Sequence, residues 1–155
     1  MKTLFDSIKV VGGIGPVSAG NATNGEWVDM RGAQRIAYLI QTGIFGDAAT
    51  LNAKLQQAKA GSDGMADATT AKDVDGAALE EVPAHNTNND GKTFAIEAAG
   101  AYDVLDLQNG FHFVRLVVTP SAASLIGAVG LQHRQTYNPP KERGLVQYVR
   151  KLRGD

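Results

Sequence analysis

The chain has 155 residues, which is enough for one domain with a substantial core and too few for two comfortable domains. Its 43% hydrophobic content excludes a wholly disordered chain, and its net charge of −1 argues against the clustered cations that nucleic-acid binding requires. The absence of cysteine excludes a disulfide framework, an iron–sulfur cluster and a cysteine-ligated zinc site. The 18 glycines predict many turns between short strands.

The first third of the chain has the pattern of strands separated by polar turns. Residues 5–15 predict a strand that ends in a glycine turn, residues 16–25 a polar loop, and residues 26–30 a short strand. Residues 34–43 give the clearest signal, because Ile36, Tyr38 and Ile40 share one face of a period-two pattern.

Residues 49–61 fit either a strand or a helix. Leu51, Ala53 and Leu55 alternate with polar residues, which favours a strand, whereas the alanine, leucine, lysine and glutamine content favours a helix. We expect a strand, connected to the preceding one by a hairpin turn at residues 43–46. Residues 62–89 are small, polar and acidic, and they predict a long loop with one short strand near residues 78–82.

The second half predicts further strands at residues 93–98, 102–107, 111–118 and 125–137, with turns at residues 108–110 and 121–124. The total of about eight short antiparallel strands, eight or nine by this count, predicts an all-β fold, a β-sandwich or jelly roll. The expected core consists of apolar residues that can share an inward phase, namely Ile36, Tyr38, Ile40, Phe94, Ile96, Val114, Leu116 and Val118.

We expect two regions, a sandwich domain at residues 1–140 and a basic C-terminal arm at residues 141–155. Leu145, Val149 and Leu152 are spaced at i, i+4 and i+7, so the arm can form an amphipathic helical turn, an extended segment or a solvated tail. Cations combined with apolar anchors suit contact with an acidic partner surface. The predicted partner contacts are Arg143, Leu145, Tyr148, Val149, Arg150, Lys151, Leu152 and Arg153.

No motif predicts chemistry. The three histidines lack the spacing of a helical metal pair, and residues 73–76 begin like a calcium loop but lack its later oxygen ligands. Residues 12–15 are glycine-rich, yet Pro16 follows and no helix pattern opens, so they do not predict a phosphate site. We therefore expect no enzyme, catalytic residue, metal or cofactor. No secretory signal or membrane-length apolar run is recognisable, and we expect no membrane partner.

Two stretches carry a family resemblance. The first is WVDMRGAQRIAYLIQTGIF at residues 27–45, followed by TLNAKLQQAKAGSDG at residues 50–64; the second is FVRLVVTPSAASLIGAVGLQHRQTYNPP at residues 113–140. In this order they resemble the small head proteins encoded beside the major capsid gene of tailed bacteriophages, some of which are jelly-roll cement or decoration proteins. The alanine-rich residues 65–85 depart from the pattern of that family.

The resemblance implies a virion structural protein on the capsid surface that binds the major capsid protein and stabilises the head. Such a protein is expected to self-associate, as a dimer ahead of a trimer, and the small residues 127–130 would allow copies to approach closely. The alternatives are a head–tail connector or tail structural protein with the same fold, and a carbohydrate-binding sandwich. Trp27 is the only tryptophan, and no second exposed aromatic is apparent beside it to form a sugar-stacking platform.

Overall fold

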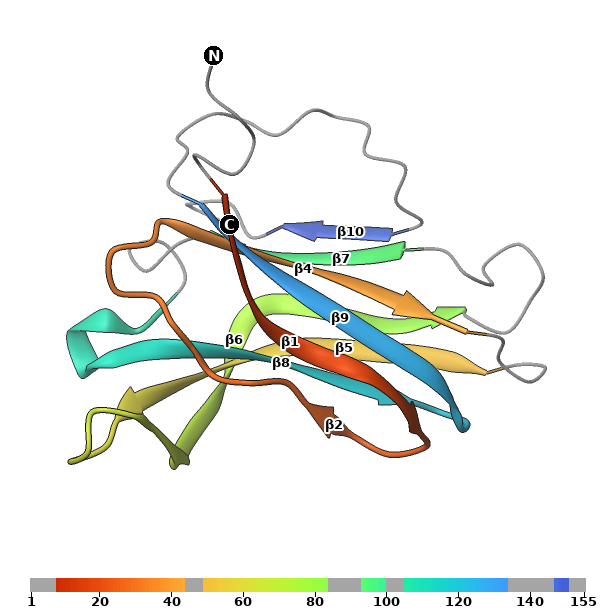
Figure 1. Ribbon diagram of the computed structural model, residues 1–155, viewed down its shortest axis with the longest axis horizontal. Coiled ribbons are helices and arrows are strands. Elements are labelled where there is room, and N and C mark those ends of the chain that lie inside the picture. Colours follow the sequence, from red (N-terminus) through yellow and green to blue (C-terminus); the bar gives the residue numbers. More distant parts are fainter. Residues whose placement is uncertain (1–7, 44–48, 84–92, 100–104, 134–146, 151–155) are drawn as a thin grey trace, which may run out of the picture.

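The computed structural model describes residues 8–43, 49–83, 93–99, 105–133 and 147–150. These residues form an all-β fold of two sheets stacked face to face (Figure 1). The strands are β1 (Ile8–Ala19), β2 (Thr23–Asn24), β3 (Val28–Asp29), β4 (Arg35–Thr42), β5 (Thr50–Ala60), β6 (Ala66–Pro83), β7 (Thr93–Ala99), β8 (Phe111–Pro120), β9 (Ser124–His133) and β10 (Gln147–Arg150). One short 3₁₀ helix, Leu107–Asn109, precedes β8.

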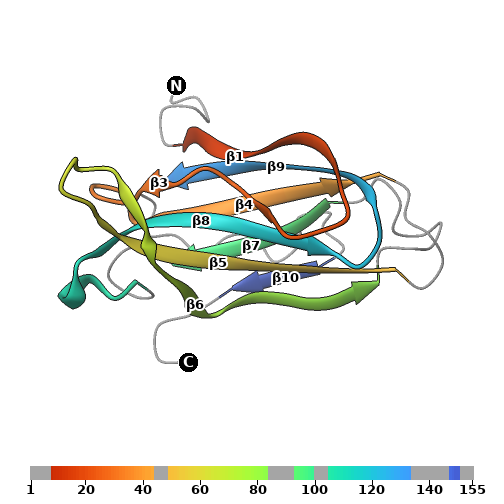
Figure 2. The ribbon, with the colours of Figure 1, turned by 90° about the horizontal axis from the view of Figure 1, so that it is seen from below.

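The strand order is that of a jelly roll. Sheet A has the order β1-β9-β4-β7-β10, and Sheet B has the order β2-β8-β5-β6, with β3 also paired to β8 (Figure 2). Most successive strands pass from one sheet to the other, as in the two Greek keys of a jelly roll, whereas β5 and β6 are neighbours in Sheet B. All pairings are antiparallel except that of β10 with β7.

The core lies between the sheets and confirms the predicted inward phases. Ile36, Tyr38 and Ile40 of β4 are fully buried, and so are Val114, Leu116 and Val118 of β8. The other two predicted core positions, Phe94 and Ile96, lie opposite Ile40 and Tyr38 in the register of β7 with β4. These inward positions are fully buried because that face of each strand packs on the opposite sheet, while some outward positions, such as Val117, are buried as well.

The glycine-rich stretch in β1 allows a bulge. The register runs from Val11, opposite Gly130, to Ile14, opposite Ala128, so Gly12 and Gly13 together face one residue of β9. A Cβ atom on Gly13 would lie 2.2 Å from the carbonyl oxygen of Ala128. Only glycine permits this close approach of the two backbones. The stretch therefore serves strand packing, and β1 continues through Pro16 to Ala19, where a polar loop was predicted.

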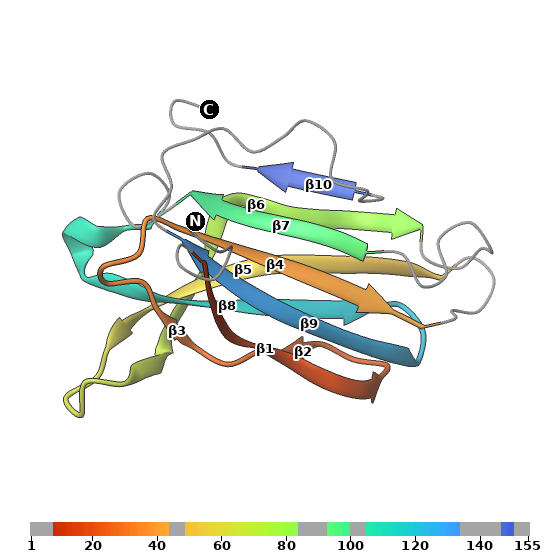
Figure 3. The same ribbon diagram turned by 45° about the horizontal axis from the view of Figure 1, so that its top comes forward.

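Three other predictions about the elements are wrong. Residues 66–83 form the long edge strand β6, where a long loop with one short strand near residues 78–82 was expected. β4 and β5 are not a hairpin, because they belong to different sheets. Residues 105–107 are not a strand, since Leu107 begins the 3₁₀ helix. Figure 3 shows that β5 and β6 instead form a hairpin that projects from the sandwich.

Candidate functional site

The described part of the predicted arm is a strand at the edge of Sheet A. Tyr148, Val149 and Arg150 lie in β10, whose backbone pairs in parallel with Ala95, Ile96 and Glu97 of β7. The other predicted contacts, Arg143, Leu145, Lys151, Leu152 and Arg153, lie outside the described residues. The structure thus places the central residues of the arm beside β7, and the last basic residues follow directly along the chain.

The outer face of Sheet B carries a connected chain of polar and aromatic contacts that the sequence did not reveal. The Arg115 guanidinium lies 4.4 Å from the centre of the Trp27 ring and donates two hydrogen bonds, of 3.1 and 2.8 Å, to Oε1 of Gln56. The Gln56 amide donates a 2.9 Å hydrogen bond to Asp73, and Asp73 also forms an ion pair with Lys54 at 2.8 Å. The contacts run from β8 through β5 to β6, so they hold three strands in register.

Two phenylalanines of β8 are covered by cations on the same outer face. Phe111 and Phe113 are 6% and 5% exposed, yet they do not belong to the core cluster between the sheets. The Nζ atoms of Lys72 and Lys59 lie 4.0 and 5.2 Å from the centre of the Phe111 ring. The Arg31 guanidinium lies 5.7 Å from the centre of the Phe113 ring. Because cations lie over both rings, the two side chains offer no open stacking platform.

Each carboxylate in these contacts is held in its charged form. The side-chain hydrogen bond from Lys54, supported by Gln56, lowers the pKa of Asp73, while burial opposes the shift. The hydrogen bonds from Lys72 and Asn109 lower the pKa of Asp106 in the same way. A general acid at neutral pH needs a raised carboxyl pKa, and these shifts have the opposite direction.

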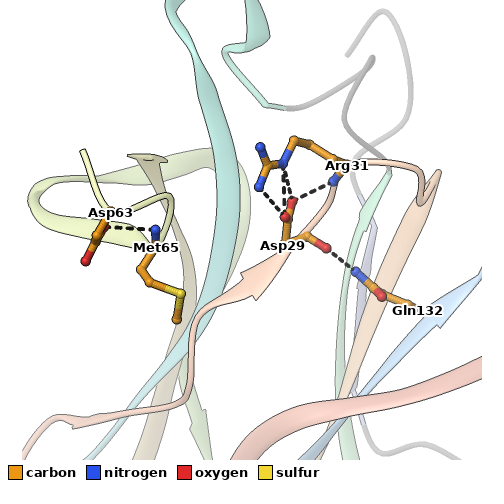
Figure 4. A network of polar contacts seen from close by, with 5 residues as sticks. All are labelled: Asp29, Arg31, Asp63, Met65 and Gln132. Atoms are coloured by element: carbon orange, nitrogen blue, oxygen red, sulfur yellow. Dashed lines mark hydrogen bonds and ion pairs between the residues drawn. The ribbon is translucent and has the colours of Figure 1, made fainter. Parts of the chain in front are cut away.

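A small group of hydrogen-bonded polar residues joins the two sheets near the start of β4. The Arg31 guanidinium forms a two-pronged ion pair with Asp29, with contacts of 2.9 and 2.6 Å to Oδ2 (Figure 4). This hydrogen bonding lowers the pKa of Asp29, against the effect of burial. The buried side chain of Gln132, from β9 in Sheet A, donates a 2.7 Å hydrogen bond to the backbone carbonyl of Asp29 in Sheet B. These contacts fix the position of β3 relative to β9 and contribute to the stability of the fold.

Sheet B also has a groove of about 590 Å³ on its outer side. Its polar lining comes from Asn52, Lys54, Glu80 and Thr119, and Val117 contributes apolar surface. Lys54 is already paired with Asp73. Among the described residues, no group of three His, Cys, Asp or Glu side chains could hold a metal ion.

The outer face of Sheet A is built differently. Leu125 and Val129 on β9 are 62% and 38% exposed, and Val10 on the neighbouring strand β1 is 53% exposed. A hollow of about 330 Å³ lies beside them, lined by Ile14, Pro16, Leu39, Gln41, Gly127, Ala128 and Val129. The part of the outer face of Sheet A around Leu125 and Val129 is thus uncharged, with Arg35 and His133 farther along the same face, whereas the outer face of Sheet B, on the opposite side of the sandwich, carries several charged groups.

No helix in the described part of the chain has the length and apolar character needed to cross a membrane.

Comparisons with known proteins give no family assignment. No family model matches the chain, and no curated protein matches it. Among solved structures, a chain of infectious bursal disease virus, Gx strain, aligns with a TM-score of 0.42 and 9% identity, covering 85% of this chain and 34% of that chain. A chain of the Gt strain aligns with a TM-score of 0.37 and 13% identity, covering 86% and 34%. This chain therefore spans about a third of those chains, and at such TM-scores the fold rests on the strand order described above.

Proposed function

We propose that the chain is a virion structural protein: a cement or decoration protein that binds the outer surface of a tailed-phage capsid and stabilises the head. The observation that carries the proposal is the strand order, because double-sheet jelly rolls are a recurrent architecture of viral capsid domains. The sequence resemblance to small phage head proteins points in the same direction. Since one fold supports many functions, the proposal depends on a binding test.

A structural role also accords with the chemistry of the described residues. The interior is filled by apolar side chains, and the carboxylates with shifted pKa values on the outer face are paired and ionised. A catalytic site needs a pocket in which titratable groups converge with perturbed pKa values. We therefore propose a non-enzymatic protein without a cofactor.

The proposed contact with the major capsid protein lies at the β10 edge of Sheet A. β10 ends at Arg150, so the cations Lys151 and Arg153 and the apolar Leu152 continue from a strand anchored to β7. Anchoring the start of the segment reduces the conformational entropy that is lost when its end binds. Cations supply attraction to an acidic capsid surface, and an apolar anchor supplies affinity that salt screens less.

The test is binding of the purified protein to genome-emptied capsids of the phage that encodes it. We expect co-sedimentation with capsids and absence from isolated tails. Removing residues 151–155, which leaves β10 intact, should lower capsid occupancy without changing the unfolding midpoint. Lys9→Ala, which removes an exposed cation from the opposite edge strand of Sheet A, is the matched control and should leave occupancy unchanged.

Two results would replace this function by the alternatives. Incorporation into tails or at the head–tail junction would favour the connector or tail protein. Retention on immobilised polysaccharide, released by free sugar, would favour the carbohydrate-binding sandwich. If the chain without residues 151–155 occupies capsids as fully as the full chain does, the arm is not part of the capsid contact.

A further inference from the structure

The sheet edges are poorly suited to pairing with another chain. β1, at one edge of Sheet A, contains Pro16 and two register irregularities, and Glu26 donates a 3.2 Å backbone hydrogen bond to Gly13. β10, at the other edge, has four residues. In Sheet B, β2 and β3 have two residues each, and β6 is interrupted by three register shifts against β5. Short, bulged or proline-containing edges hinder strand addition, so the sheet faces are better suited than these edges to association.

The two outer faces differ in what they offer a partner. On Sheet B, the cations Arg115, Lys54 and Lys72 are already engaged by Gln56, Asp73 and Asp106 within the chain. Another protein would have to displace or desolvate these pairs. On Sheet A, Leu125 and Val129 are exposed, and the outward positions from Leu125 to Leu131 on β9 carry no charge. Their neighbours on β4, Leu39 and Gln41, are also uncharged.

Gly127 lines the hollow on the outer face of Sheet A, and packing within the chain does not require glycine there. A Cβ at this position would meet its nearest atoms at 3.7 Å, an ordinary contact, and its φ is not positive. By contrast, a Cβ on Gly130 would meet the Gly12 carbonyl oxygen at 2.8 Å. Glycine within a strand lowers stability and often marks a close approach of another surface. The atoms nearest to such a Cβ belong to Ile14 and Pro16, which line the hollow together with Gly127, so the missing side chain at Gly127 deepens the hollow.

We propose that the outer face of Sheet A is a two-fold interface with a second copy of this chain, in which Leu125 of each copy enters the hollow above Gly127 of the other. A two-fold contact requires that one patch contain both complementary parts, because residue i contacts j while j contacts i. Here a protruding leucine and a hollow floored by glycine lie two residues apart on one strand. Charge complementarity favours a second copy as well, since an uncharged patch meets an equally uncharged patch and buries no unpaired charge. The inference is independent of capsid binding, because it concerns the purified chain alone.

The first test is sedimentation equilibrium over a concentration series. We expect a reversible dimer, and Leu125→Lys should weaken the dimerisation constant at least 100-fold, because a two-fold interface loses the leucine and gains the charge twice. Met65→Lys is the matched control, since Met65 is 67% exposed on the β5–β6 hairpin, and it should dimerise as the wild type does. Emission from Trp27, which lies on the opposite sheet, reports whether each variant is folded.

A second variant separates the interface from folding. Gly127→Val fills the hollow with a residue that favours strands, so it should unfold at no lower urea concentration than the wild type while dimerisation is lost. In addition, a cysteine replacing Leu125 should react with maleimide more slowly as protein concentration rises, because the chain has no other cysteine and the interface covers this one. A cysteine replacing Met65 should react at a constant rate.

Three results would overturn the proposal. These are a wild-type monomer at all concentrations, a dimer that persists in both Leu125→Lys and Gly127→Val, and labelling at position 125 that is independent of concentration. A monomer whose capsid binding is abolished by Leu125→Lys would assign the face to the capsid protein instead of a second copy.

Discussion

The pair Gly13→Ala and Gly127→Ala tests the strand packing most directly. The two glycines lie on the adjacent strands β1 and β9, and neither has a positive φ, so backbone strain does not distinguish them. Their surroundings do. An added Cβ at position 13 would stand 2.2 Å from the Ala128 carbonyl oxygen and 2.8 Å from its carbon, whereas one at position 127 stays at 3.7 Å or more from its neighbours.

The expected stabilities follow from these distances. Gly13→Ala forces β1 away from β9, and overpacking of this kind costs about 1–3 kcal/mol. Gly127→Ala makes no clash and reduces the freedom of the unfolded chain, so it should stabilise by about 0.4–1 kcal/mol. The free energies of unfolding of the two variants should therefore differ by about 1.4–4 kcal/mol, with Gly13→Ala the less stable.

Urea unfolding followed by Trp27 emission measures this difference, at a protein concentration low enough to keep both variants monomeric. The denaturant slopes should agree, so that the midpoints compare directly. Equal midpoints for the two variants would refute the close approach of β1 and β9 at the bulge. The glycine-rich stretch would then require another explanation than packing.

Three further predictions concern the core and the face of Sheet B. Tyr38→Phe should stabilise by roughly 1 kcal/mol, because the hydroxyl is buried without a hydrogen-bond partner among the described residues. Burial also raises the pKa of Tyr38 above 10.0. The wild type should therefore lose free energy of unfolding through this group only as the pH rises above about 10. Tyr38→Phe should lack this loss when unfolding is measured over a pH series. Leu116→Ala, at a fully buried position, should cost about 2–5 kcal/mol in urea unfolding, whereas Leu125→Ala at an exposed one should cost far less. Arg115→Ala should shift the emission of Trp27 and cost about 1 kcal/mol; unchanged emission would contradict the stacked contact.

The sequence predicted the strands whose inward face is apolar throughout. In β5, burial alternates along the strand as the residue types do, whereas in β4 and β8 the inward positions are fully buried and several outward positions are buried as well. β6 escaped prediction because it is an edge strand with many small and polar residues and three register shifts, which remove the period-two signal. The predicted β4–β5 hairpin failed because a turn signal does not show whether the next strand stays in the same sheet.

The candidate surfaces depend on register, which the sequence does not contain explicitly. Gln56 meets Arg115 on one side and Asp73 on the other only because β5 pairs with both β8 and β6 in the observed register. Phe111 and Phe113 are buried on the outer face under cations from neighbouring segments, an arrangement that also depends on the register. On β9, apolar residues occupy both phases, so the pattern could not show that Leu125 and Val129 face outward while Ile126 faces the core.

The proposed dimer and the proposed capsid contact use different parts of Sheet A, and this makes them compatible. The hollow lies over β1, β9 and β4, whereas β10 lies beyond β7 at the border of the sheet (Figure 3). In a face-to-face pair centred on β9, the β10 edge of each copy would stay at the perimeter, so each pair would offer two arms. Two linked arms raise the effective concentration of the second contact once the first has formed, provided that both can reach the capsid. Leu125→Lys and removal of residues 151–155 therefore perturb separate steps: the first should abolish pairing, and the second should weaken each arm while leaving the pair intact.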